Sequence, residues 1–496
     1  MSGPSAPRPA DEVALLARVP TRLFIGGEWV ESTSGRGLAV SDPSTGGELL
    51  TVADASIADG LRAMDAAAVA QPGWAATPAR ERGELLRAAF DLLQQRAEDF
   101  ALLMTLEMGK PLAESRGEVA YGGEFLRWFG EEAVRIPGHY GRTPEGTGTM
   151  IVTRRPVGPS YFITPWNFPL AMATRKLAPA LAAGCTSVIK PSELTPLTTL
   201  FLAQLLQDAG LPAGVVNVIT TTESQEVSAP IIADARLRKL SFTGSTAVGV
   251  SLLTQAANGV LRTSMELGGN APFVVFDDAD LDAAVDGAML AKFRNIGEAC
   301  TAANRFIVQE GVADEFARRV TERVGALRVG RGAEDGTQIG PLITAAAVTK
   351  VAGLVDDAVA RGAELRTGGR RIDGPGTFFE PTVLTGVAPG SGILSQEIFG
   401  PVLAISTFTD EANAVRQAND TQYGLVSYVY TRDLARGHRM IDALETGMMG
   451  LNVGVISNAA APFGGVKQSG LGREGGAEGI LEFLETKYTL VGDAAS

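Results

Sequence analysis

Apolar residues recur at three- and four-residue steps through two long stretches in the first third of the chain. Residues 80–106 and 114–134 both have this spacing, which is typical of amphipathic helices. Glycine and proline then gather between residues 137 and 148, which predicts a connection. Residues 150–157 follow as a predicted strand, which we place at the edge of a sheet.

A different pattern begins at Ser160, where short apolar runs alternate with helical segments. This alternation predicts a parallel sheet with helices on both faces, and such sheets bind ligands beyond the carboxyl ends of their strands. A second alternating region extends from about residue 280 to 444, and residues 484–491 predict a final strand. The strands expected in the first region are 161–164, 187–190, 215–219, 239–242 and 271–276, with helices at 170–183 and 197–209.

Composition narrows the class of protein. A chain of 496 residues is too long to fold around one compact core, so two or three domains are expected. The net charge of −13 argues against nucleic acid and against an anionic membrane surface as partners. The chain contains no apolar run of membrane-spanning length, and residues 1–20 resemble a disordered leader and not a secretory signal. Two cysteines fit a reducing, cytoplasmic environment.

Scarce cysteine and histidine restrict the possible chemistry. Cys185, Cys300, His139 and His438 are too scattered for a metal site, and no G-x-S-x-G is present. Catalysis must therefore rest on Cys, Glu, Asn, Lys or Arg. Cys185 lies in an apolar segment and is typical of a buried structural cysteine. Cys300 has polar neighbours and a glycine, which fits a nucleophile better.

Two segments follow predicted strands and could hold a nucleotide. Residues 241–249 place Gly244, Ser245 and Gly249 at the start of a helix, whose amides can face a pyrophosphate. An ordinary strand–helix turn is the alternative, and Val250 replaces the lysine that a nucleoside triphosphatase would need. The G-x-G-x-x-G of residues 470–475 follows no apolar strand, so we interpret it as a loop.

Three polar side chains stand out in the first region. Lys190 and Glu193 end a strand and could hold ribose hydroxyls, or else form an incidental ion pair in a solvated loop. Glu266 is expected between a helix and a strand, beside two glycines, or as a surface residue at a helix end. Asn167 lies in a proline-flanked turn where its amide could donate to an oxyanion, or simply stabilise the turn.

The order and spacing of these motifs resemble the aldehyde dehydrogenase superfamily over residues 22–492. The matching segments are PWNFP (165–169), KPSE (190–193), FTGS (242–245), ELGG (266–269), the Cys300 segment, EIFGP (397–401) and PFGG (462–465). The resemblance implies an α/β fold with a Rossmann-like doubly wound cofactor domain, an α/β catalytic domain and a small β oligomerisation element. The implied boundaries are 1–20 for the leader, 21–136 with 158–268 for the cofactor domain, 269–450 for the catalytic domain, 451–480 for a return segment near the active site, and 137–157 with 481–496 for oligomerisation strands.

The resemblance also implies roles for individual residues. Cys300 would attack an aldehyde as a thiolate, Asn167 and the Cys300 amide would hold the oxyanion, and Glu266 would activate water. NAD is the expected hydride acceptor, because the Glu193 carboxylate would repel the 2′-phosphate of NADP, although NADP stays possible. The cofactor-binding set that it implies is Thr164, Pro165, Trp166, Lys190, Ser192, Glu193, Gly244, Ser245, Gly249, Leu267, Glu397 and Phe399.

Within the superfamily the chain is most similar to enzymes that oxidise succinate semialdehyde, through ATRK (173–176), KFRN (292–295), GVISN (454–458) and KQSGLGRE (467–474). This likeness implies that Arg175, Arg294 and Ser457 bind the substrate's distal carboxylate. The alternative for each arginine is an internal ion pair. Ala302 stands where many relatives carry a second cysteine, which argues against a disulfide switch. Glu298 and Ala299 replace the more familiar Gln-Thr.

Several alternatives stay open at this point. The substrate could be glutarate semialdehyde or a neutral aliphatic aldehyde, and the acyl group could pass to coenzyme A. A catalytically silent nucleotide-binding relative is also conceivable, although it would need neither Cys300 nor Glu266. The strands expected at residues 150–157 and 484–491 lie outside the main alternation, which predicts a homodimer or homotetramer.

Overall fold

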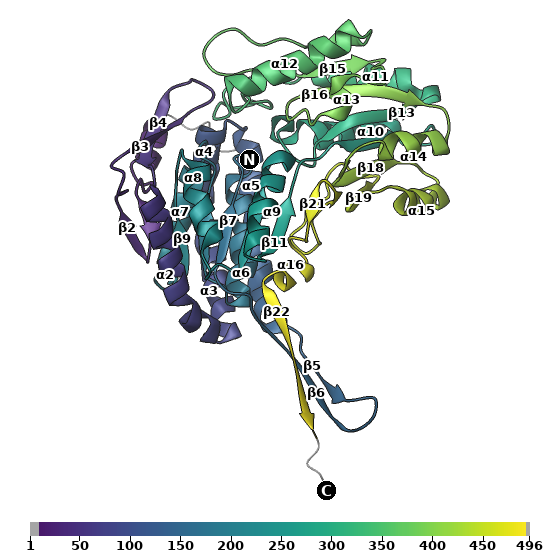
Figure 1. The fold of residues 1–496 in the computed structure, drawn as a ribbon. Coiled ribbons are helices and arrows are strands. Elements are labelled where there is room, and N and C mark those ends of the chain that lie inside the picture. The colour runs from purple at the N-terminus through teal and green to yellow at the C-terminus, as the bar shows by residue number, and fades with distance from the viewer. Residues whose placement is uncertain (1–8, 493–496) are drawn as a thin grey trace.

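The computed structural model describes residues 9–492. Its body has two parts, each a sheet covered by helices, which are called the first and the second layer (Figure 1). The first layer is an eight-stranded sheet of order β2-β1-β9-β8-β7-β10-β11-β21, parallel from β9 to β11 and antiparallel at both margins. Its strands are β1 (Leu23–Ile25), β2 (Glu28–Val30), β7 (Ser160–Ile163), β8 (Ser187–Lys190), β9 (Val216–Val218), β10 (Lys239–Thr243), β11 (Arg262–Glu266) and β21 (Gly470–Leu471).

Helices cover both faces of this sheet, because successive side chains of each strand point to opposite sides. On β7, Phe162 packs among the helices of one face, while Tyr161 and Ile163 pack against those of the other. The helices around Phe162 are α3 (Ala79–Gln95), α4 (Ala97–Met108), α5 (Leu112–Glu132), α6 (Pro169–Ala183) and α7 (Leu197–Asp208). The opposite face carries α2 (Ile57–Ala76), α8 (Ser224–Ala233) and α9 (Thr246–Asn258).

The second layer is a seven-stranded sheet of order β14-β15-β16-β13-β12-β18-β19. Only β14 runs antiparallel to its neighbour. The strands are β12 (Ala271–Val275), β13 (Ala303–Gln309), β14 (Glu364–Thr367), β15 (Thr382–Thr385), β16 (Val402–Phe408), β18 (Val426–Tyr430) and β19 (Met448–Leu451). The helices of this layer are α10 (Leu281–Phe293), α11 (Glu310–Gly325), α12 (Ala345–Ala360), α13 (Gly392–Ser395), α14 (Glu411–Asn419) and α15 (Leu434–Ala443). The two sheets confirm the predicted α/β class.

A three-stranded antiparallel sheet projects from the body (Figure 1). It consists of β5 (His139–Arg142), β6 (Gly148–Pro156) and β22 (Leu484–Gly492). The edge position predicted for residues 150–157 is wrong, because β6 is the central strand. Nine residues of β22 pair with β6, so the C-terminal strand covers the edge that the sequence left open.

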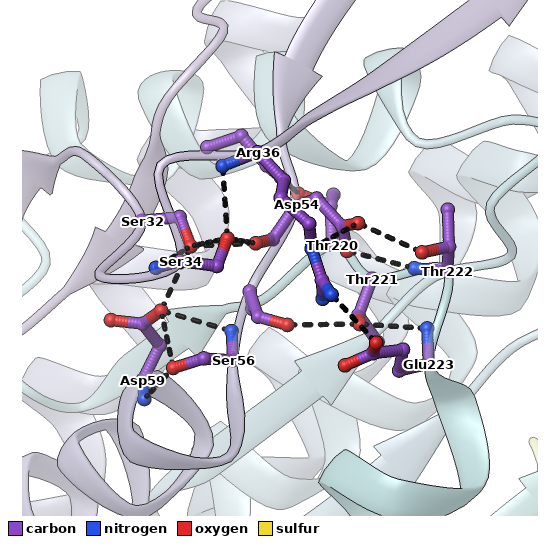
Figure 2. Close-up of polar contacts among 12 residues, drawn as sticks. Ser32, Ser34, Arg36, Asp54, Ser56, Asp59, Thr220, Thr221, Thr222 and Glu223 are labelled. Carbon is purple, nitrogen blue, oxygen red and sulfur yellow. Dashed lines mark hydrogen bonds and ion pairs between the residues drawn. The ribbon is translucent and has the colours of Figure 1, made fainter.

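A network of short polar side chains fastens the N-terminal strands to the first sheet (Figure 2). Asp59, near the start of α2, accepts hydrogen bonds from the Ser56 amide and the Ser32 hydroxyl, both at 3.0 Å. Asp54 accepts from the amide and hydroxyl of Thr222, beyond β9, at 2.9 and 2.8 Å. These contacts hold together segments that the hydrophobic pattern does not connect.

Smaller elements complete the fold: α1 (Pro9–Leu16), β3 (Gly37–Ser41), β4 (Glu48–Ala53), η1 (Ala133–Arg135), η2 (Arg294–Gly297), β17 (Tyr423–Gly424), β20 (Val466–Lys467) and α16 (Glu478–Leu481).

Two expectations about the N-terminal region need correction. The single helix predicted over residues 80–106 is broken at Arg96, which leaves helical geometry (φ −107°, ψ 19°) and pairs with Asp208 at 2.7 Å. Residues 9–16 of the predicted leader form α1, because Leu15 is buried and Glu12 pairs with Arg331 at 2.7 Å. The rest of the leader before Pro9 lies outside the described residues. No helix in the described part of the chain is long and apolar enough to cross a membrane.

Candidate active site

A cavity of about 260 Å³ opens between the two sheets, where β7, β10 and β11 end side by side. The first sheet contributes the turns that follow these three strands, and the second layer contributes Cys300, α12 and the segment before β16. This is the position at which open parallel sheets bind ligands. The residues around the cavity are Pro165, Trp166, Asn167, Met172, Thr243, Gly244, Ser245, Glu266, Leu267, Gly268, Cys300, Ala347, Lys350, Glu397 and Phe399.

Ten of the residues singled out from the sequence meet in this cavity, including Cys300, Glu266 and Asn167. Met172, Ala347 and Lys350 also line it, and the sequence analysis did not name them. Thr243 and Gly268 line it too, and the sequence analysis quoted them only within the FTGS and ELGG motifs, without a role. Lys350 had no local signal, because it lies on α12, outside every motif. The described residues contain no cluster of three or more His, Cys, Asp or Glu side chains suited to a metal ion.

Cys300 lies just before β13 and is partly buried. Burial raises the pKa of its thiol to about 12; Arg175 lowers this pKa, whereas Glu397 and Glu266 raise it further. Burial and the two carboxylates thus oppose formation of the thiolate that the sequence analysis expected, and Arg175 favours it. Attack on a carbonyl requires this thiol to lose its proton.

The loop before Cys300 is held in an uncommon backbone conformation. Asn295 and Ile296 have φ values of 54° and 63°, in the left-handed region that a β-branched residue rarely adopts. Asn295 Nδ2 donates to the Glu298 carbonyl at 2.9 Å, and Asn167 Nδ2 donates to the same carbonyl at 3.1 Å. The Asn167 amide is thus fixed beside the nucleophile loop, and its second N–H can still serve an oxyanion.

Glu266 is the last residue of β11, not a residue between a helix and a strand as the sequence analysis expected. The strand was missed because Arg262–Glu266 mixes polar and apolar residues, although it pairs with β10 over five positions. The carboxyl group is 3% exposed, and neither oxygen has a hydrogen-bond partner in the described structure. Burial, together with the negative charge of Glu474, raises the pKa of Glu266 well above its usual value.

Glu474 brings a buried charge cluster next to Glu266. Its two oxygens lie 2.6 Å from Lys176 Nζ and 2.6 Å from an Arg175 guanidinium nitrogen. Burial alone raises the pKa of Glu474, but the two cations lower it below the usual value, so this carboxylate stays ionised. The sequence analysis quoted Glu474 and Lys176 in two motifs, 298 residues apart along the chain, without assigning either a role.

Arg175 therefore has an internal partner. Besides the ion pair, its guanidinium lies 4.0 Å from the centre of the Phe463 ring. This is the internal ion pair that the sequence analysis kept as the alternative to carboxylate binding, although Arg175 shares the Glu474 carboxylate with Lys176.

Arg294 and Ser457 lie away from the cavity between the sheets. Arg294 forms no ion pair within the described residues, and its guanidinium lies 5.5 Å from the Phe168 ring centre. Ser457 borders a second hollow of about 410 Å³, whose wall includes Tyr121. Tyr121 is buried, and burial raises the pKa of its hydroxyl, while Arg175 and Arg294 lower it.

The first cavity has the features of a dinucleotide site. The Ser245 side chain caps none of the α9 amides, so the first turn of α9 can face a phosphate group. Trp166 and Phe399 meet edge to face at 5.4 Å, and Thr243 Oγ1 is buried without a partner in the described structure. Glu397 accepts from the Gly269 amide at 3.1 Å, and burial raises the pKa of Glu397 to about 7. These groups fit the ribose, ring and pyrophosphate of a nicotinamide cofactor.

The remaining predicted cofactor residues lie at the end of β8 and around the cavity. Lys190 is buried, and its ammonium donates to Ser224 Oγ at 3.0 Å. Glu193 is exposed near Lys190, and Ser192 and Thr164 are buried in the adjoining turns. Gly249 packs against Leu267, which lines the cavity. A Cβ at position 249 would lie 2.4 Å from the Leu267 side chain, so this close packing requires glycine.

The predicted loop at residues 470–475 contains a short strand. Gly470 and Leu471 form β21 and pair with Glu266 and Met265. A Cβ on Gly470 would lie 1.8 Å from the Met265 carbonyl oxygen, so the close approach requires glycine. This glycine motif therefore supports Glu266 and delivers Glu474, and it does not bind a nucleotide in the manner of a Rossmann turn.

Comparison with known proteins agrees with this geometry. The aldehyde dehydrogenase family matches residues 29–489. A succinate-semialdehyde dehydrogenase of Paenarthrobacter nicotinovorans is 60% identical over 90% of this chain and 99% of its own length. A glutarate-semialdehyde dehydrogenase of Pseudomonas putida is 48% identical over 95% of this chain and 97% of its own. The crystal structure of an NADP-dependent enzyme of E. coli superposes with a TM-score of 0.95 and 46% identity, covering 97% of this chain and 99% of that one.

Proposed function

The chain belongs to the aldehyde dehydrogenase family, and from this premise we propose that it oxidises succinate semialdehyde to succinate. The observation that carries the proposal is the shared cavity of Cys300, Glu266 and Asn167, which unites a nucleophile, a base and an oxyanion donor. Bound NAD(P) would supply the hydride acceptor, held by the groups around Glu397, Phe399 and Ser245.

Each residue has a defined task in this reaction. The Cys300 thiol loses its proton to solvent, its sulfur forms a bond to the aldehyde carbon, and the carbonyl electrons move to oxygen. The Asn167 amide and the Cys300 backbone N–H stabilise that oxyanion, and one such donor is typically worth about 3–4 kcal/mol. After the hydride has left the carbon, a thioester remains. Glu266 removes a proton from the water that attacks this thioester, the bond between the acyl carbon and Sγ breaks, and the acid leaves while Cys300 is regenerated.

We propose Arg294 as the main ligand of the substrate's distal carboxylate. It is the one predicted arginine without an ion-pair partner in the described structure, and its guanidinium matches a carboxylate in shape. Ser457, on the wall of the second hollow, would add a hydroxyl. Arg175 would instead hold Glu474 and shape the charge around Glu266.

Replacing Arg294 with glutamine should lower kcat/KM for succinate semialdehyde by roughly ten- to a hundredfold, through loss of a charge-assisted hydrogen bond. Butanal has no carboxylate and should lose far less. Steady-state kinetics with both aldehydes tests this, with Arg175→Gln as the matched variant, for which we expect both substrates to suffer. An equal loss for both aldehydes in Arg294→Gln would remove the carboxylate role.

Glu193→Ser should improve the use of NADP relative to NAD by about five- to tenfold, because it removes a negative charge facing a 2′-phosphate. The exposed position of Glu193 beside Lys190 favours this reading. The check is the ratio of kcat/KM for the two cofactors. A ratio that stays constant or moves towards NAD would show that another group sets the preference.

We also propose that the enzyme is a homodimer or a dimer of dimers. Tyr488, Leu490 and Val491 are exposed on β22, an edge strand of the projecting sheet. Exposed apolar edges are sites at which chains pair. Light scattering at micromolar concentration should give the mass of two or four chains, and removal of residues 485–496 should lower it. The mass of a single chain for the full-length protein would refute the proposal.

One experiment distinguishes the remaining substrates. The purified protein would be supplied with succinate semialdehyde, glutarate semialdehyde and butanal, each with NAD and with NADP. The similarity to a glutarate-semialdehyde dehydrogenase makes the second aldehyde the main competitor. Succinate semialdehyde should give the largest kcat/KM, and coenzyme A should not raise turnover if water is the acceptor. No turnover with any aldehyde would indicate a silent relative.

A further inference from the structure

A fully buried ion pair lies behind the turn that carries Asn167. Lys110 follows the end of α4 and Glu118 lies in α5, and both side chains are 0% exposed. Lys110 Nζ lies 2.6 Å from Glu118 Oε2. A buried pair of this kind seldom adds net stability, because two charges must leave water. A contribution to stability therefore does not account for this ion pair, and its contacts with the neighbouring backbone suggest a different role.

Each member of the pair holds one end of the same turn. Lys110 Nζ donates to the backbone carbonyl of Asn167 at 2.7 Å. Glu118 Oε1 accepts from the amides of Leu170 and Ala171, at the start of α6, at 2.9 and 3.0 Å. The pair thus fixes the backbone on both sides of the two residues between Asn167 and Leu170.

The Asn167 carbonyl also connects this pair to the nucleophile loop. Asn295 Nδ2 donates to it at 3.1 Å and also to the Glu298 carbonyl, to which Asn167 Nδ2 donates in turn. A continuous chain of hydrogen bonds therefore extends from Glu118 through Lys110 and Asn167 to the peptide two residues before Cys300. Displacement of the Asn167 backbone would move the oxyanion donor relative to the sulfur.

We infer that the Lys110–Glu118 ion pair is a positioning device that fixes the Asn167 amide against Cys300. The inference rests on the proposed oxyanion role of Asn167. Neither residue borders the cavity around Cys300, so the pair acts through the turn and not on the substrate. A role confined to packing between α5 and α6 would affect stability without a specific effect on the oxyanion step.

The chain offers a matched control in Glu107. This carboxyl group, 0% exposed, caps α7 in the way that Glu118 caps α6, accepting from the Leu197 and Thr198 amides at 2.8 and 2.9 Å. The turn directly before α7 contains none of the predicted catalytic residues, whereas the turn before α6 contains Asn167. Glu107→Gln therefore reports the cost of altering a buried cap, and Glu118→Gln reports that cost together with any effect on Asn167.

The first experiment measures hydride transfer in a single turnover of the holoenzyme with succinate semialdehyde. We expect Glu118→Gln and Lys110→Met to reduce this rate about ten- to a hundredfold, with KM changed less than about threefold. Glu107→Gln should stay within about twofold of wild type. Alkylation of Cys300 by iodoacetamide and the Kd of the cofactor should be unaltered in all variants. If Lys110→Met does not fold, Lys110→Met/Glu118→Gln removes both charges and should show the same loss.

A double-mutant cycle with Asn167→Ala completes the test. In the Asn167→Ala background, Lys110→Met should lower hydride transfer by less than about twofold, because the group that it positions is gone. Additive losses, or unchanged hydride transfer in the single Lys110 and Glu118 variants, would overturn the inference while leaving Asn167 as the oxyanion donor. Near-wild-type hydride transfer in Asn167→Ala would instead overturn the proposed role of Asn167, and the positioning role with it.

Discussion

Cys300→Ala is expected to abolish dehydrogenase turnover, by roughly 10⁴-fold or more, because it removes the one thiol that lines the described cavity, and the hydride-transfer route depends on a thiohemiacetal. The fold should persist, since alanine removes a single sulfur atom from a partly buried position. NAD(P)H formation with succinate semialdehyde measures the loss. Thermal unfolding and cofactor binding should match wild type.

Cys185→Ala is the matched control for this prediction. Cys185 is fully buried among apolar side chains, its thiol donates to the Phe483 carbonyl at 3.4 Å, and burial raises its pKa to about 11. Its removal should cost some stability and leave turnover near wild type. Substantial activity in Cys300→Ala, or a comparable loss in Cys185→Ala, would contradict the covalent mechanism.

Glu266→Gln is expected to separate the two halves of the reaction. Hydrolysis of the thioester needs a base, and both Glu266 oxygens lie in the cavity without a hydrogen-bond partner in the described structure. Steady-state turnover should fall about 10²- to 10⁴-fold. One equivalent of NAD(P)H per active site should still form, and the acylated enzyme should accumulate on Cys300. Rapid-mixing kinetics and intact-protein mass spectrometry would detect these two signals.

The raised pKa of Glu266 determines the direction in which the rate of thioester hydrolysis changes with pH. A base must be ionised, and the pKa of Glu266 is raised by burial and by the nearby Glu474 carboxylate. Hydrolysis in the wild-type enzyme should therefore slow as the pH falls through this raised pKa, which lies well above that of an ordinary glutamate. Glu266→Gln should lose this dependence. A variant that keeps both the rate and the pH profile would assign the base to another residue.

The local pattern of the sequence was sufficient for much of the framework. Strands such as β7 and β8 are short apolar runs between helices, and this signal predicted the parallel sheet and the position of Asn167 at a strand's carboxyl end. The pattern failed where burial comes from distant segments. Arg262–Glu266 is too polar to be read as a strand, yet β10 and β21 pair with it on both sides.

The sequence by itself therefore determined the fold class and the set of chemical groups, because strand periodicity and motif spacing are local properties of the chain. The tertiary structure alone decided how those groups act. Arg175 acquires its partner from Glu474, almost 300 residues away, and Lys110 reaches the carbonyl of Asn167, 57 residues further along the chain. The protonation of Cys300 likewise depends on burial and on charges from three separate segments. Burial and electrostatic fields arise only when distant segments pack together, so no local pattern could predict them.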